Sequence, residues 1–112
     1  MRRNEQTRVR YRSPRRSRAG STGDERSVLR TLQTIPGVGP SIARDLMNLG
    51  IRSVADLRGK DPERLYDREC RRQGKPVDRC LLYVFRCAVY YASTAQPKPE
   101  LLLWWNWKDR RL

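Results

Sequence analysis

The chain has 112 residues, with 25 Lys and Arg against 12 Asp and Glu, no His and a formal net charge of +13. This length allows one domain with a modest core, and the basic balance favours an anionic polymer as partner. Three Cys without a twin-Cys spacing, in a chain that lacks His, argue against a disulfide framework and a zinc site, so we expect no metal and no cofactor.

Residues 1–22 form an Arg-rich stretch, which we expect to be a disordered basic arm. Arg, Ser, Gly and Thr dominate it, Pro14 interrupts it, and only Val9 and Tyr11 could join a core. Such an arm can bind nucleic acid through phosphates, although a solubilising extension would have the same composition. A folded domain is then expected over residues 23–112.

Neither end of the chain carries an apolar segment that could act as a signal peptide or cross a membrane. The longest apolar stretch, Leu101 to Trp105, is far shorter than a spanning helix. We therefore expect a soluble, cytoplasmic protein with no membrane partner.

A sharp turn between two helices is the most informative local pattern. The first helix should have Asp24 as its N-cap, and its apolar face should end at Ile35. Gly37-Val38-Gly39 must then reverse the chain, with Val38 pointing into the core and Pro40 at the first position of a second helix. Gly50 is a typical stop for that helix.

Backbone N–H groups at this turn could bind a phosphate, because the dipole of the second helix also favours an anion there. We expect Gly39 to adopt a conformation that favours glycine and to let a phosphate approach the backbone closely. The nearest cation is Arg44. The candidate donors are the N–H groups of Gly37, Val38, Gly39, Ser41 and Ile42. A plain helix–turn–helix corner that binds nothing remains the alternative.

Two further helical segments precede the most apolar one. A short helical turn is expected over residues 54–58. Asp61-Pro62-Glu63 has the cap, the N1 proline and the acidic first turn of a helix start, and that helix should end near Gly74. Its inward side chains should be Leu65, Tyr66 and Cys70.

Residues 77–93 should form the longest and most buried helix, the centre of the bundle. Arg79, Tyr83, Arg86 and Tyr90 share one face at helical spacing. That face could contact phosphates and bases, or the arginine stems could cover the tyrosine rings at a solvated edge. The three cysteines, Cys70, Cys80 and Cys87, are expected to be reduced core residues.

The C-terminal stretch from Leu101 to Trp107 is too apolar to stay in water. We expect it to fold back over the bundle as a clamp. A stacking platform for unpaired bases and a protein-docking patch are the alternatives.

Residues 32–46 resemble the helix-hairpin-helix motif, with an apolar residue, Pro, Gly-apolar-Gly, three residues, then Ala. A wider resemblance, over residues 27 to about 109, is to the small bacterial "pathogenicity locus" family, whose members are often labelled mitomycin-resistance proteins. It rests on Ile35–Ala43, Asp78, Cys80 and Trp104-Trp105-Asn106-Trp107-Lys108, among others. The resemblance implies an all-α, compact four- to five-helix bundle of the paired helix-hairpin-helix or SAM-like type. It also implies DNA backbone as partner and a link to DNA damage.

We therefore expect a non-enzymatic module that binds DNA without sequence specificity. Catalysis is disfavoured because no His can serve a Cys nucleophile and the carboxylates show no paired spacing, so no small-molecule substrate is expected. The alternative is a protein–protein interaction module that uses the bundle or the Trp-rich C-terminus. The expected DNA-binding residues are Gly37, Val38, Gly39, Ser41, Ile42, Arg44, Arg79 and Arg86.

Overall fold

The computed structural model describes residues 21–112, and all regular structure in that part of the chain is helical. The elements are α1 (Ser21–Leu32), α2 (Pro40–Asn48), η1 (Ala55–Leu57), α3 (Pro62–Gln73), α4 (Cys80–Ser93), η2 (Pro99–Leu102) and η3 (Trp104–Trp107), where η marks a short 3-10 helix. The expected all-α class is confirmed for these residues. The predicted basic arm lies outside them, except for Ser21 and Thr22, which belong to α1.

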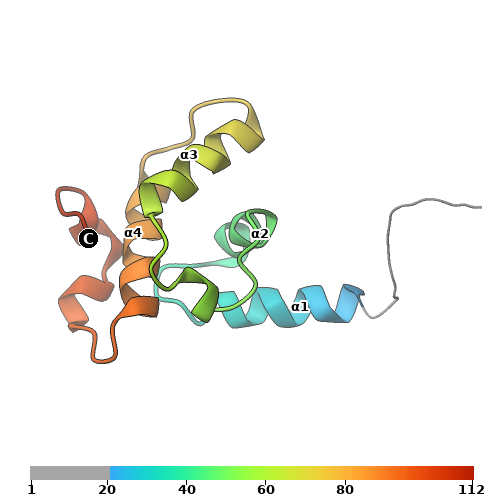
Figure 1. Cartoon of the computed structure of the whole chain (residues 1–112), viewed down its shortest axis with the longest axis horizontal. Helices are drawn as coiled ribbons and strands as arrows, with labels where there is room; N and C mark the ends of the chain where they lie inside the picture. Colours follow the sequence, from blue (N-terminus) through green and yellow to red (C-terminus); the bar gives the residue numbers. More distant parts are fainter. Residues whose placement is uncertain (1–20) are drawn as a thin grey trace, which may run out of the picture.

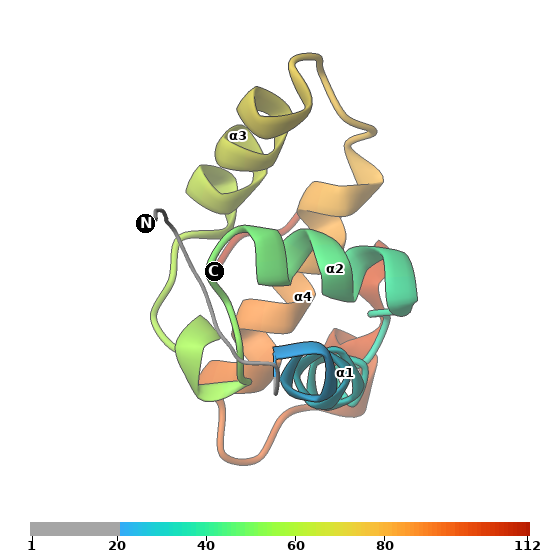
Figure 2. The ribbon, with the colours of Figure 1, turned by 90° about the vertical axis from the view of Figure 1, so that its right-hand side faces the viewer.

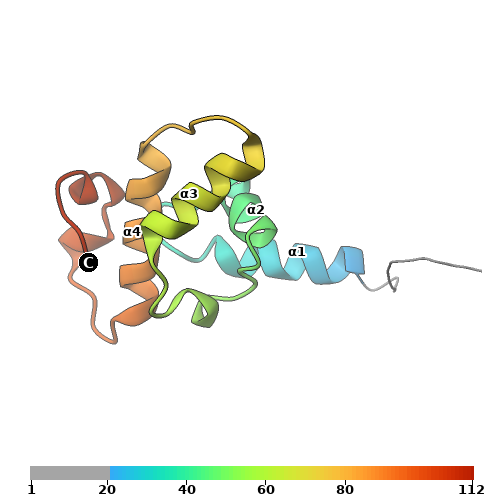
Figure 3. The ribbon, with the colours of Figure 1, turned by 45° about the horizontal axis from the view of Figure 1, so that its top comes forward.

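The central element is α4, which runs through the middle of the molecule (Figure 1). The C-terminal segment with η2 and η3 lies on one side of α4, and α1 and α2 lie on the other (Figures 1 and 3). Viewed along α1, α2 lies directly above it with α4 behind (Figure 2). The expected apolar stripe of α4 is buried, including Leu81, Val84, Phe85, Ala88 and Ala92.

The starts of α2 and α3 confirm the sequence prediction because their signals are local. Pro40 opens α2, and Gly50 follows its end with a φ of +91°. The Asp61 carboxylate accepts hydrogen bonds from the backbone N–H groups of Glu63 and Arg64, which satisfies donors that the first turn of α3 leaves without partners.

Two helix starts differ from the prediction. Helix α1 begins at Ser21, so Asp24 lies in its first turn and is not its N-cap. Helix α4 begins at Cys80 and not at residue 77, because the Asp78 side chain accepts the N–H of Cys80, two residues further on, at 2.8 Å. An Asp that bonds the backbone two residues on forms an Asx turn, which here precedes the helix.

The C-terminal clamp is confirmed. Trp107 is buried, its indole N–H donates to the carbonyl of Leu101 at 2.8 Å, and its ring centroid lies 5.3 Å from that of Tyr90 on α4. We use "clamp" below for residues 99–107. Within residues 21–112, no helix is both long enough and apolar enough to cross a bilayer.

Candidate nucleic-acid interface

The turn between α1 and α2, residues 33–39, is fixed by buried side chains and by a hydrogen bond inside the turn. Ile35 and Val38 are buried, and the N–H of Val38 donates to the carbonyl of Ile35 at 3.1 Å. The inward orientation of Val38 is therefore confirmed. Its N–H, which we expected to be available to a phosphate, is instead used inside the turn.

The other expected donors keep their N–H groups available. Within residues 21–112, the N–H groups of Gly37, Gly39, Ser41 and Ile42 donate no hydrogen bond. The first hydrogen bond of α2 is made by Ala43, whose N–H donates to the carbonyl of Gly39 at 2.9 Å. The N–H groups of Ser41 and Ile42 thus belong to the first turn of α2, at the positive end of its dipole.

Gly39 does not adopt the conformation that we expected. Its φ of −94° and ψ of −172° are extended, and any residue can adopt them. A Cβ added to Gly39 would have no neighbouring atom within 4 Å. The space in front of Gly39 is therefore open, and the fold does not require glycine there.

Gly37 is the residue of the turn that requires glycine. Its φ is +84°, and a Cβ at this position would lie 3.1 Å from Cδ1 of Trp104. The positive φ penalises side chains, and the indole leaves little room for one. The contact also joins the turn to the clamp, two segments far apart in the sequence.

The three expected cationic residues have different surroundings. Arg44 on α2 and Arg79 at the start of α4 are exposed. Arg86 is buried, with only 4% of its side chain accessible. Its Nε lies 2.7 Å from a Glu63 carboxylate oxygen, and its Nη1 donates to the carbonyl of Trp107 at 2.8 Å. Arg86 is therefore not accessible to a phosphate, and the prediction that it binds DNA is wrong.

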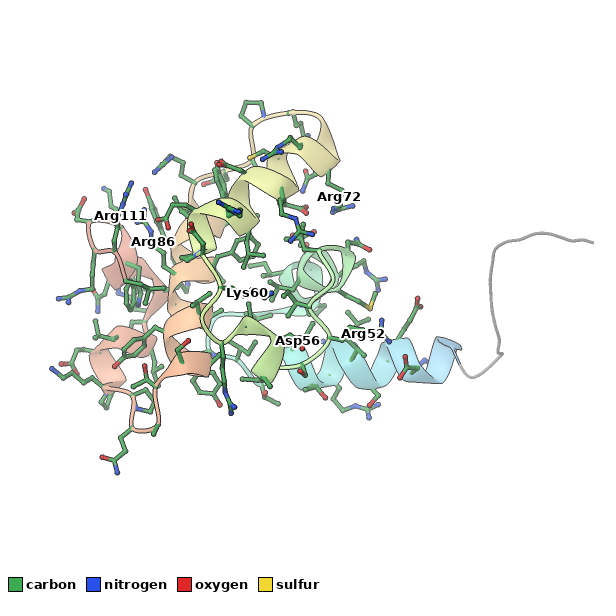
Figure 4. The ribbon with its side chains drawn as sticks, viewed as in Figure 1. Arg52, Asp56, Lys60, Arg72, Arg86 and Arg111 are labelled. Carbon is green, nitrogen blue, oxygen red and sulfur yellow. The ribbon has the colours of Figure 1, made fainter. Side chains whose placement is uncertain are left out.

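The face of α4 that carries Arg79, Tyr83, Arg86 and Tyr90 is where the clamp packs. Arg86 binds the Trp107 carbonyl, its Cζ lies 5.8 Å from the centroid of the Tyr83 ring, and the Tyr90 ring packs on Trp107. The Tyr90 hydroxyl also accepts the N–H of Lys98 at 2.9 Å. Figure 4 shows Arg86 beside the C-terminal segment, near Arg111. The part of this face from Arg86 to Tyr90 is therefore structural, whereas Arg79 at its start stays exposed.

A charged cluster between α2 and α3, with a buried glutamate, was not expected from the sequence. The Glu69 side chain is fully buried, and Arg72 binds its two carboxylate oxygens at 2.8 and 2.7 Å. Arg72 also reaches Asp45 on α2 at 3.4 Å, so it bridges the two helices (Figure 4). No local signal separates Glu69 from the exposed carboxylates of α3.

The two carboxyl groups of this cluster have opposite pKa shifts. Burial raises the pKa of Asp45, and the nearby negative charge of Glu69 raises it further. Burial would also raise the pKa of Glu69, but hydrogen bonds from Arg72 and Gln73 bring it below its ordinary value. The ionised form is thus disfavoured at Asp45 and favoured at Glu69.

The cysteines differ from the expectation at one position. Cys87 is buried, and burial raises the pKa of its thiol to about 11. Cys70 is half-buried, while Cys80 is exposed and is not a core residue. Because α4 begins at Cys80, its side chain lies at the helix end and not on the covered face. In residues 21–112, no three Cys, Asp or Glu side chains gather in a way that could hold a metal ion.

These features define a small, basic, all-α protein whose tight glycine turn is tied to a tryptophan clamp. The chain belongs to the pathogenicity locus family (Cdd1), whose model matches residues 25–112. It is 36% identical over 80 residues to "Mitomycin resistance protein McrB" of Streptomyces lavendulae, covering 71% of this chain and 72% of that protein. No solved structure matches the chain.

Proposed function

We propose that this protein binds DNA through the phosphate backbone, without reading sequence and without catalysing a reaction. In this proposal the α1–α2 turn acts as a helix-hairpin-helix motif. The observation that supports it most directly is the row of N–H groups at Gly39, Ser41 and Ile42 without acceptors among residues 21–112. They belong to the start of a helix, where an anion is favoured by both hydrogen bonds and the dipole.

The surroundings of the turn fit a phosphate. Gly39 has no atom in front of it, so a phosphate oxygen can reach the backbone there. Arg44 is exposed on α2, and Arg79 is exposed at the start of α4. Main-chain donors meet phosphates and not base edges, so binding should depend little on sequence.

The name of the Streptomyces relative refers to resistance to mitomycin. We extend this to a role in the response to DNA damage in the bacterial cytoplasm. The alternative is a protein–protein interaction module, which the exposed Leu103 and Trp105 side chains would favour. The salt dependence of binding distinguishes these two functions, because binding to phosphates weakens steeply with salt while apolar docking does not.

Gly39→Asp and Gly39→Val test the proposal by binding of labelled duplex DNA, measured by fluorescence anisotropy. Both variants should stay folded, because Gly39 has ordinary backbone angles and open space. Each should weaken binding by about tenfold or more, the scale of a lost hydrogen bond to a charged group. Asp should have the larger effect because it also repels the phosphate.

Asn48→Asp is the matched control, since it makes the same charge change at an exposed residue in the last turn of α2. It should leave DNA affinity within about threefold of the unmodified protein, as expected for a distant surface charge. If the Gly39 variants stay folded by circular dichroism and bind as tightly as Asn48→Asp, the α1–α2 turn is only a structural corner.

A further inference from the structure

A groove of about 330 Å³ lies between the start of α4 and the C-terminal segment. Arg79 and Tyr83 line it from α4, and Trp104, Trp105 and Lys108 line it from η3 and the residue that follows. We call it the aromatic groove. Its volume is at the lower end of the range for small-ligand sites, with room for a nucleobase and its sugar but not for a duplex.

The aromatic groove offers a flat stacking surface. Trp105 is a large aromatic residue that keeps 54% of its surface accessible. It stands edge-on to Trp104, with ring centroids 5.6 Å apart and planes at 84°. Trp104 is packed against the core and fixes one edge of Trp105, so the indole is held in place while much of it faces water. A base stacked on such a ring would gain affinity whatever its identity.

Two cations flank these rings. Arg79 and Lys108 are both exposed, and neither forms a salt bridge within residues 21–112. The groove also contains the Asp78 carboxylate, but this group accepts the N–H of Cys80 and so occupies the start of α4. A phosphate would therefore be bound by the side chains of Arg79 and Lys108 and not by the end of the helix. The charge pattern suits a nucleotide better than an apolar peptide.

Trp104 connects the aromatic groove with the α1–α2 turn. Trp104, which lines the groove, is the side chain that packs against Gly37. The phosphate donors of the turn and the stacking surface are thus joined by a single indole.

We infer that the aromatic groove binds an unpaired nucleotide next to a duplex held at the α1–α2 turn, so that the protein prefers DNA with a single-stranded extension. This inference rests on the proposed function, since the duplex is held by the turn. Trp105 stacks on the base, and Arg79 and Lys108 bind the flanking phosphates. The groove thereby selects DNA structure, whereas the turn binds any duplex.

The test compares a labelled blunt duplex with the same duplex carrying a short thymidine tail, one tailed duplex for each strand polarity. The full chain should bind at least one tailed duplex about fivefold to a hundredfold more tightly than the blunt one, the range expected for one stacked base. Trp105→Ala should remove this preference and leave blunt-duplex affinity unchanged. Trp105→Phe should retain part of it, because a smaller ring still stacks.

Leu103→Ala is the matched control, because Leu103 is also an exposed apolar residue of the clamp but does not line the groove. It should keep the full preference. Equal binding of tailed and blunt duplexes, or a preference that survives Trp105→Ala, overturns the inference and leaves the proposed function standing. Binding of neither DNA overturns both. Binding of tailed but not blunt duplex supports the groove and contradicts the role of the turn.

Discussion

The two glycines of the α1–α2 turn differ in backbone conformation and in their surroundings. Gly37 has the positive φ and the close Trp104 ring, whereas Gly39 has extended angles and open space. The sequence predicts a tight turn, but it does not show which glycine has the unusual backbone. That depends on how the turn meets Trp104, which lies far along the chain. The fold therefore requires glycine at position 37 but not at position 39, where we propose that glycine serves phosphate binding.

Gly37→Ala should lower the free energy of unfolding by about 1–3 kcal/mol, the usual cost of a side chain in the left-handed region. The nearby indole adds to this cost, since it must shift to admit a Cβ. Gly39→Ala should change stability by no more than about 0.5 kcal/mol, as expected for an unstrained surface change. Urea denaturation of both variants measures the difference. Equal losses would contradict the different backbone conformations of Gly37 and Gly39.

Asp45→Asn and Glu69→Gln should have opposite effects on stability at neutral pH. The raised pKa of Asp45 means that its ionised form disfavours the folded state, so Asn should stabilise. The lowered pKa of Glu69 means that its ionised form favours the folded state, so Gln should destabilise.

Both differences should fade on acidification. The Asp45 penalty is present above its raised folded pKa and is gone below the ordinary value of 3.8. The Glu69 contribution is present above the ordinary value of 4.5 and is lost as pH falls through its lowered folded pKa. Urea midpoints at neutral and acidic pH check both signs, and a Glu69→Gln variant that is more stable than the parent at neutral pH would contradict this account.

At the scale of elements, the helices could be predicted because their signals lie within a few residues of one another. Pro40 and Asp61 mark their helix starts whatever the rest of the chain does. The role of Arg86 could not be predicted, because it depends on Glu63 arriving from α3 and Trp107 from the clamp. Most candidate donors at the turn could be predicted for the same local reason. The inclusion of Arg86 is wrong, because the clamp covers this side chain.

Glu63→Ala should lower the free energy of unfolding by about 2–3 kcal/mol, because it leaves the buried Arg86 guanidinium without its carboxylate. This is less than the loss for a fully buried pair, since 33% of the Glu63 side chain remains accessible to water. Thermal and urea unfolding measure the loss.

Arg111→Ala is the control for Glu63→Ala. The Arg111 Nε lies 3.9 Å from the same carboxylate, but 75% of its side chain is exposed. Its removal should cost no more than about 0.5 kcal/mol, as for other surface pairs. If both substitutions cost the same, the Arg86–Glu63 pair does not hold α4 to α3.

At the scale of the whole molecule, basic charge extends beyond the part that defines the family. The family match begins at residue 25, while the Arg-rich stretch lies before it. The helical part accounts for the fold and for the proposed phosphate contacts. From composition alone, we therefore expect the first 20 residues to add separately to the proposed DNA affinity.

Removal of residues 1–20, which leaves α1 intact, should not change helicity or melting temperature. It should flatten the dependence of DNA affinity on salt, because each lost phosphate contact removes about 0.9 from the log–log slope. Replacing the arginines of this stretch by lysine is the control and should keep the slope. A truncated protein with an unchanged slope would show that these residues do not touch DNA.

The contact between Trp104 and Gly37 has a consequence for genetics. A screen for lost DNA binding would return substitutions in the clamp as well as in the turn, although the two are distant in the sequence. Alleles at Trp104 act by loosening the fold, so their defect should grow with temperature and be rescued by stabilising second-site changes such as Asp45→Asn. Gly39 alleles remove a contact without loosening anything, so they should fail at every temperature and resist such suppressors.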